Sequence, residues 1–143
     1  MKKMLSILCA SVICLSCSSM YAYAEGNDSP ADDPVISEYV YTDYISSHLS
    51  INPSGNATGS SRVDGSSTLV TKIVVNQYLQ KKNGSDWDTI DSWNNTTYTY
   101  TNYCDFPYTV SSAGTYRIRT VAEVYHNSSY ETVDCNSNSV AYP

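Results

Sequence analysis

The sequence predicts an all-β protein made of short antiparallel strands, and three observations support this. Thr, Val, Tyr, Ser and Asn dominate after residue 34, and these residues favour strands and turns. No segment keeps an apolar period of 3.6 residues for three turns, so no amphipathic helix is expected. Short runs of alternating apolar and polar residues recur instead, separated by turn signals. Together these features indicate a sandwich of two sheets or a barrel.

Residues 1–24 have the features of a secretory signal peptide. The chain opens with Met-Lys-Lys, runs apolar to Cys17 and reaches an Ala-Tyr-Ala site that ends at Ala24. The apolar run is shorter than the roughly 20 residues of a membrane-spanning helix. We therefore expect cleavage after Ala24 and secretion, with no membrane attachment afterwards. The alternative is a lipid anchor at Cys17, but Cys14 stands where the lipidation pattern has an aliphatic residue.

Residues 25–34 contain four acids and two prolines but no large apolar side chain, so we expect a flexible acidic tether. Residues 35–143 then form one β-sandwich domain of ordinary size. The whole sequence has a net charge of −6, and loss of the leader removes two lysines and no acid. This acidity argues against binding to nucleic acid or anionic membranes, which requires clustered Lys and Arg.

The first half of the domain is predicted to hold strands at residues 35–44, 45–51, 56–63, 69–82 and 87–93. The first two end at an Asn-Pro-Ser-Gly turn, and the third ends at an Asp-Gly-Ser-Ser turn. The fourth is the clearest strand, because Ile73, Val75 and Leu79 share one face and polar residues share the other. An Asn-Gly-Ser hairpin turn then reverses the chain into the fifth strand.

The second half is predicted to hold strands at residues 98–110, 115–125 and 130–142. The first of these has one face that we expect to be buried, formed by Tyr98, Tyr100, Cys104, Phe106, Tyr108 and Val110. The next alternates between charged residues and a face formed by Tyr116, Ile118, Thr120, Ala122 and Val124. This count predicts an immunoglobulin-like antiparallel β-sandwich of about seven or eight strands.

Cys104 and Cys135 are the only cysteines after the leader. An even pair in an exported protein predicts one disulfide. Counting back from turns near Ala113 and Ser128 puts both cysteines at about the same height in the sandwich. The alternative is two separate thiols, since a free cysteine packs well as a small apolar side chain. Two thiols without paired histidines predict no zinc site, and no other metal or cofactor is expected.

Aromatic residues are the candidate ligand-binding side chains. Trp87 and Trp93 have the same parity on one short strand, and exposed tryptophans on a β-sandwich can stack on sugar rings. We nevertheless expect at least one of them to fill the core, as a tryptophan does in many immunoglobulin-like domains. Tyr39, Tyr41 and Tyr44 lie in a segment poor in aliphatic residues, so they could form an exposed interaction patch. Packing at a sheet edge explains these tyrosines equally well.

No residue is assigned a catalytic role, and the chain is not expected to be an enzyme. His48 and His126 are the only histidines, and neither has a partner at a motif spacing. The acids of the 86–91 segment fit solvated turn positions. A small hydrolase without a local motif would need a pocket that brings one of these histidines to an Asp and a Ser.

Four segments together resemble a known group of proteins. They are residues 72–82 with Gly84 and Trp87, Ser92-Trp93, residues 113–119, and residues 130–133. They resemble a family of small secreted Gram-positive bacterial proteins that is catalogued as a domain of unknown function. The resemblance implies an exported β-sandwich of the immunoglobulin or fibronectin type III kind, and it brings no activity, cofactor or catalytic residue.

These observations favour a secreted, non-enzymatic module with an interaction or structural role outside the cell. Its partner would be an extracellular protein or a glycan, and the domain is expected to be a monomer. The first alternative is a carbohydrate-binding module that uses exposed aromatic residues. The second is the small hydrolase.

Overall fold

The computed structural model describes residues 39–143, so the predicted signal peptide, the tether and residues 35–38 lie outside the described residues. The strands of the described part are β1 (Thr42–Ile51), β2 (Asn56–Gly65), β3 (Lys72–Asn83), β4 (Asp86–Thr97), β5 (Thr101–Thr109), β6 (Gly114–His126), β7 (Ser129–Asn136) and β8 (Val140–Tyr142). Within residues 39–143, no helix is long and apolar enough to span a membrane.

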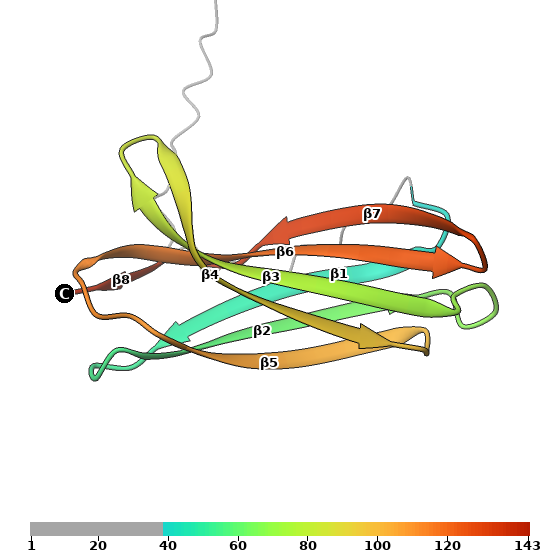
Figure 1. Cartoon of the computed structure of the whole chain (residues 1–143), viewed down its shortest axis with the longest axis horizontal. Coiled ribbons are helices and arrows are strands. Elements are labelled where there is room, and N and C mark those ends of the chain that lie inside the picture. The colour runs from blue at the N-terminus through green and yellow to red at the C-terminus, as the bar shows by residue number, and fades with distance from the viewer. Residues whose placement is uncertain (1–38) are drawn as a thin grey trace, which may run out of the picture.

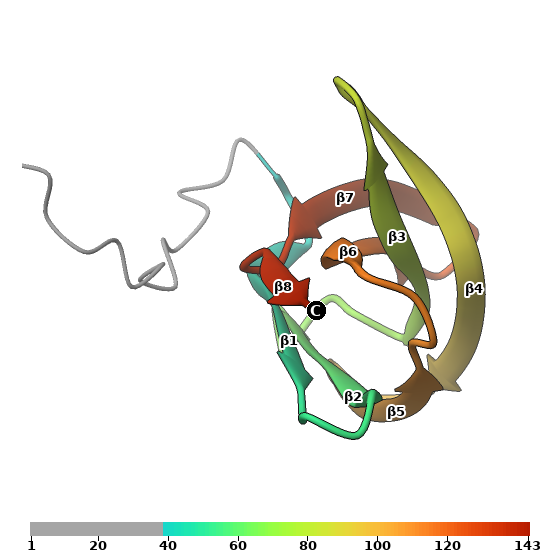
Figure 2. The ribbon, with the colours of Figure 1, turned by 90° about the vertical axis from the view of Figure 1, so that its left-hand side faces the viewer.

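The strands form two antiparallel sheets that lie face to face (Figure 1). The smaller sheet has the order β1-β2-β5, and the larger has the order β4-β3-β6-β7, with β8 paired to the start of β6. The view along the strands shows how the chain passes between the sheets after β2, after β4 and after β5 (Figure 2). The predicted immunoglobulin-like antiparallel β-sandwich is confirmed.

A tyrosine corner fixes the connection from β5 to β6. The ring of Tyr116 is buried, and its hydroxyl donates a hydrogen bond to the backbone carbonyl of Ser112, four residues earlier. This bond is a hallmark of the corner at which an immunoglobulin-like chain passes from one sheet to the other. It gives the Gly-Thr-Tyr sequence at the start of β6 its structural role.

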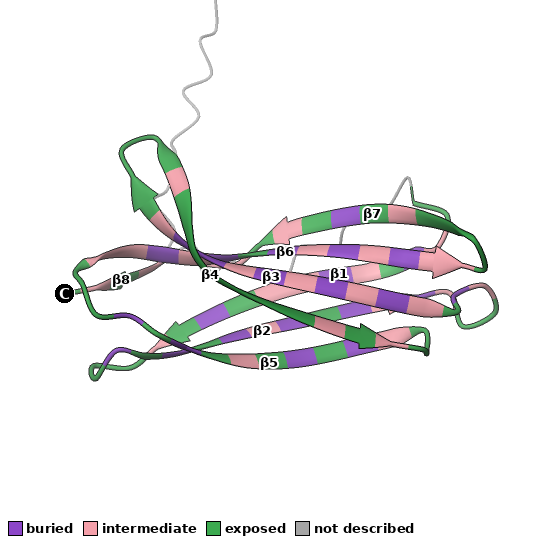
Figure 3. Cartoon of the chain, in the orientation of Figure 1, coloured by how far each residue is buried: buried purple, intermediate pink, exposed green. Residues whose placement is uncertain are grey.

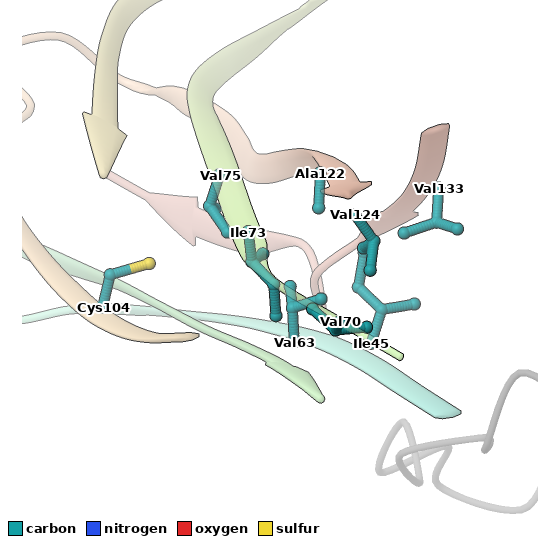
Figure 4. Packing of buried hydrophobic residues seen from close by; sticks show 9 residues of the cluster. All are labelled: Ile45, Val63, Val70, Ile73, Val75, Cys104, Ala122, Val124 and Val133. Atoms are coloured by element: carbon teal, nitrogen blue, oxygen red, sulfur yellow. The ribbon is translucent and has the colours of Figure 1, made fainter. Parts of the chain in front are cut away.

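Buried and exposed residues alternate along most strands, as expected for a sheet with one face in the core (Figure 3). The apolar core consists of two clusters. The first contains Ile45, Val63, Val70, Ile73, Val75, Cys104, Ala122, Val124 and Val133 (Figure 4). The second contains Leu49, Ala57, Leu79, Tyr108, Val110, Tyr116 and Ile118. The residues predicted to share one face of β3 and one face of β6 therefore do point into the core.

A layer of hydrogen-bonded polar side chains lies between the two clusters. Gln77 is fully buried, and its Nε2 donates to Ser61 Oγ at 2.6 Å. The hydroxyl of Tyr108 donates to Gln77 Oε1 at 3.2 Å. Ser61 Oγ lies 2.6 Å from Thr120 Oγ1, which donates in turn to Ser47 Oγ at 3.0 Å. This chain of bonds links both sheets through the middle of the sandwich.

Several predicted strand boundaries are wrong, and β4 continues to Thr97 instead of ending at Trp93. The segments predicted at 35–44 and 45–51 give one described strand, β1, whose register shifts beside Asp43. β3 begins at Lys72 rather than at Leu69, because backbone bonds to Ser66 form a turn there. Tyr98 and Tyr100 were predicted on a buried face. They precede β5 and are 81% and 47% exposed.

The last predicted strand, 130–142, is divided into β7 and β8 by residues 137–139, and two of these residues bond neighbouring strands through their side chains. Ser137 Oγ accepts a hydrogen bond from the backbone N–H of Ile118. The side-chain amide of Asn138 bonds both the N–H and the carbonyl of Leu49 on β1. Nearby, the carboxylate of Glu131 accepts backbone N–H bonds from residues 40–42. These contacts seal the edge between β1 and β7.

Candidate functional site

A shallow cavity of about 210 Å³ lies on the outer face of the three-stranded sheet. We call it the hollow; it is lined by Ser46, His48, Ser60, Ser61, Arg62, Tyr103, Cys104 and Asp105. Outward-facing residues recur at every second position of a strand, and the register sets them in two rows. One row is Ser46, Arg62 and Tyr103, and the other is His48, Ser60 and Asp105. Small serines between longer side chains leave the depression open.

Arg62 is held in place from several sides. Its guanidinium lies 5.3 Å from the ring centroid of Tyr44 and 5.0 Å from that of Tyr103. Its Nε donates to Asp64 Oδ2 at 2.7 Å. The hydrogen bond to Asp64 raises the pKa of Arg62. The hollow therefore has an ordered guanidinium on one side, ion-paired with Asp64.

The other polar groups of the hollow have no such partners. The side chains of Ser46, His48, Ser60 and Asp105 make no hydrogen bond to another residue within 39–143. Their donors and acceptors face water and are available to a ligand. This combination of one fixed cation and several available polar groups makes the hollow the best candidate site in the described part of the chain.

The outer face of the larger sheet also carries aromatic and charged residues, but their polar groups already bond one another. The Arg117 guanidinium lies 4.2 Å from the centroid of the Trp87 ring, and its Nε donates to Gln80 Oε1 at 2.9 Å. At the other end, Lys72 Nζ lies 3.5 Å from the centroid of the Tyr125 ring. The Tyr125 hydroxyl donates to Glu123 at 2.6 Å. These clusters offer fewer available groups than the hollow does.

His48, Ser60 and Asp105 stand in one row, yet their order does not suit a catalytic triad. Ser60 pairs with His48 on one side and with Asp105 on the other. Neighbouring strands are about 4.8 Å apart, which puts His48 and Asp105 about 10 Å apart. In a triad the histidine lies between the acid and the serine, so that the acid can orient the ring. The row lacks that arrangement.

The second histidine, His126, lies elsewhere. Its Nδ1 contacts the backbone carbonyl of Leu69, and the centroids of the His126 and Tyr41 rings are 5.6 Å apart. Among residues 39–143, the His126 ring contacts Leu69, Asn127 and Tyr41 but neither an Asp nor a Ser, so it does not form the pocket that a hydrolase would need.

Trp87 and Trp93 were predicted to share a face, and this is wrong. The pairing of β3 with β4 shifts between Leu79 and Gln80, which leaves Ile90 as an extra residue on β4. A bulge of this kind reverses the alternation beyond it. Trp93 pairs with inward-facing Gln77, whereas Trp87 pairs with outward-facing Lys82. The two rings therefore lie on opposite faces and cannot form one platform.

The prediction that at least one tryptophan fills the core is also wrong. Trp93 is 43% exposed and stacks on Phe106 at the open edge between β4 and β5, with ring centroids 5.4 Å apart. Trp87 is half-buried beneath Arg117.

The predicted tyrosine patch is dispersed over the N-terminal part of the structure. Tyr41 packs against the first core cluster and the ring of His126. Tyr44 lies on the outer face of the small sheet, against Arg62. Tyr39 is partly exposed at the start of the described chain. Of the five predicted ligand-binding aromatics, Tyr44 contacts a residue of the hollow, Arg62.

The predicted disulfide between Cys104 and Cys135 is absent from the structure. The two cysteines do lie at the same height along the sandwich, as predicted. Cys104 pairs with Ser61 in the small sheet, the Ser61 hydroxyl bonds Thr120 across the core, and Thr120 pairs with Cys135 in the large sheet. Their lateral positions differ, however. β5 lies beside β4, and β7 lies beside β1, so the cysteines stand at opposite edges of the two sheets. Their Cα atoms cannot approach within the 7 Å or so that a disulfide requires.

Cys104 should resist alkylation in the folded protein. Burial, with a smaller contribution from Asp105, raises the pKa of its thiol to about 11. Little of the reactive thiolate then exists at pH 8. Iodoacetamide should label Cys104 only after denaturant is added, as peptide mass spectrometry can measure. The exposed variant Ser50→Cys serves as the reference for fast labelling. Native labelling of Cys104 at the reference rate, or recovery of a Cys104–Cys135 peptide, would contradict this expectation.

Among residues 39–143, no group of three or more His, Cys, Asp or Glu side chains is placed to hold a metal ion. Comparison with known proteins adds no assignment. No family model, no curated protein and no solved structure matches the chain. The site has to be interpreted from its own geometry.

Proposed function

We propose that this chain is a non-enzymatic interaction module that acts outside the cell and binds its partner through the hollow. The observation that carries the proposal is the contrast between Arg62, fixed by Tyr44, Tyr103 and Asp64, and the available polar groups around it. A rigid charged group beside available hydrogen-bonding groups can bind with little loss of conformational entropy. Secretion remains an expectation from the N-terminal sequence.

The geometry gives less support to the two alternatives in their original form. A carbohydrate-binding platform of Trp87 and Trp93 would need both rings on one face, and the bulge at Ile90 separates them. A hydrolase would need the imidazole of His48 between Ser60 and Asp105, and the register places the serine in the middle. Binding without catalysis is the function that the hollow supports best.

Substitutions in the hollow should weaken binding to the natural partner. The test is retention of the full chain on immobilised cell-wall glycan, mucin and matrix proteins. Arg62→Ala and Tyr103→Ala should each weaken retention by about tenfold or more on the surface that holds the unmodified protein. Both positions are exposed, and a surface ion pair contributes little to stability, so the fold should survive.

Tyr130→Ala is the matched control, because Tyr130 is 56% exposed on the larger sheet, away from the hollow. It should be retained like the unmodified protein. Equal retention of all four proteins would show that the hollow does not bind the partner. Circular dichroism of each variant separates loss of binding from loss of folding.

A further inference from the structure

We propose that the hollow binds one uncharged sugar residue, an inference that rests on the proposed binding function. The argument begins with charge. Arg62 stands in one row of the hollow and Asp105 in the other, with Ser60 next to both. A ligand anion would be attracted by Arg62 but repelled by Asp105 and Asp64, and a ligand cation would meet the reverse. A neutral ligand with many hydroxyl groups satisfies both sides.

The available atoms match the hydroxyl groups of a sugar. A hydroxyl group both donates and accepts, so it can accept from the Arg62 guanidinium and donate to the Asp105 carboxylate. Hydrogen bonds to charged groups are stronger than those between neutral groups. Ser46 and Ser60 add hydroxyl groups to the lining, and His48 adds a ring nitrogen. A ligand with few polar groups would leave these atoms without partners.

Size and shape limit the ligand to a single ring. The volume of about 210 Å³ is below the roughly 300–1,000 Å³ of pockets for drug-sized ligands. Tyr103, which is 61% exposed, supplies an apolar surface beside the polar floor. The C–H groups of a pyranose can pack there while its hydroxyl groups reach Arg62 and Asp105. The hollow is thus suited to the terminal residue or one side residue of a glycan.

The experiment uses the full chain and ligand-observed saturation-transfer NMR with methyl glycosides. Methyl glucoside, galactoside and N-acetylglucosaminide are the neutral probes. Methyl glucuronide adds a negative charge, and methyl glucosaminide adds a positive charge. At least one neutral probe should bind. The charged probes should have affinities about tenfold lower, which corresponds to a difference in binding free energy of about 1.4 kcal/mol.

Three variants test whether the signal comes from the hollow. Ser60→Phe fills the floor with a residue that suits a strand and should abolish the signal. Ser50→Phe places the same side chain on the same outer face of the small sheet, but on β1 and outside the hollow. It should leave the signal unchanged. Asp105→Asn removes the negative charge at constant size. This variant should bind the neutral sugar more weakly, and the ratio of its affinities should shift toward the glucuronide by about tenfold.

The outcomes separate this inference from the proposed function. Equal or tighter binding of a charged probe to the unmodified chain overturns the neutral-sugar assignment. The neutral-sugar assignment is also overturned if no sugar gives a signal although the chain still binds glycan or matrix surfaces through Arg62 and Tyr103. In that case the proposed interaction function stands. A neutral-sugar signal that Ser60→Phe does not alter places the sugar elsewhere and also overturns the assignment.

Discussion

Replacing Gln77 with leucine should lower the free energy of unfolding by about 1–3 kcal/mol, because the buried Tyr108 hydroxyl loses its partner, while Ser61 keeps its bond to Thr120. Gln77 is 0% exposed and lies in the polar layer, where its amide bonds Ser61 and Tyr108. Leucine fits the volume but can satisfy neither hydroxyl. Each polar group left unpaired in the core costs about 1–3 kcal/mol. Urea unfolding followed by fluorescence measures the change.

The double variant Gln77→Leu with Tyr108→Phe supplies the control. Once the tyrosine hydroxyl is removed, the group that Gln77→Leu leaves unpaired no longer exists, and replacing both partners by apolar groups can be nearly neutral. The double variant should therefore be less destabilised than the sum of the single variants by about 1 kcal/mol or more. Strict additivity, or an unchanged midpoint for Gln77→Leu, would show that the bonded layer does not stabilise the fold.

Replacing Gly55 with alanine should destabilise the protein by about 3 kcal/mol, the sum of a backbone cost and a steric cost. Gly55 ends the turn between β1 and β2 with a φ of +82°, where a side chain is unfavourable by about 1–2 kcal/mol. An added Cβ would also overlap the carbonyl oxygen of Val110, which is backbone and cannot rotate away. Overpacking of this kind costs a further 1–3 kcal/mol or so.

Gly84→Ala separates the two contributions. Gly84 also has a positive φ, +60°, but a Cβ added there would meet no atom within 4 Å. Only the backbone cost applies, so the loss should be about 1 kcal/mol. The difference between the two variants, measured by thermal and urea unfolding, isolates the contact with Val110. Equal losses of stability in the two variants would mean that the backbone near Gly55 and Val110 makes room for the added Cβ at no cost.

The sequence predicted those features that depend on local alternation. The inward-facing residues of β3 and β6 alternate regularly, so residues such as Val75, Ile118 and Val124 were correctly predicted to share a face on their strands. The strand count was also close, because turns with Gly, Asn and Pro mark most strand ends. Tyr98 was misplaced because alternation alone does not reveal where a strand begins.

Features set by pairing between distant strands were not predicted. The bulge at Ile90 leaves no mark in the alternation of β4, so the tryptophans appeared to share a face. The cysteines lie at one height, but only the strand order shows that β5 and β7 are far apart in the sandwich. The hollow needs three strands in register, and its serines look like ordinary surface residues in the sequence. Among the predicted binding residues, Tyr44 contacts Arg62 of the hollow.

The bulge in β4 bears on whether the protein aggregates at high concentration. β4 is an edge strand of 12 residues whose outer side is paired with no other described strand, and such an edge can template fibre growth by strand addition. Ile90 interrupts the straight run of backbone groups, and Asp86, Asp88 and Asp91 place like charges along it. Two such edges repel each other and fit poorly. The irregular hairpin thereby protects the domain against self-association into aggregates.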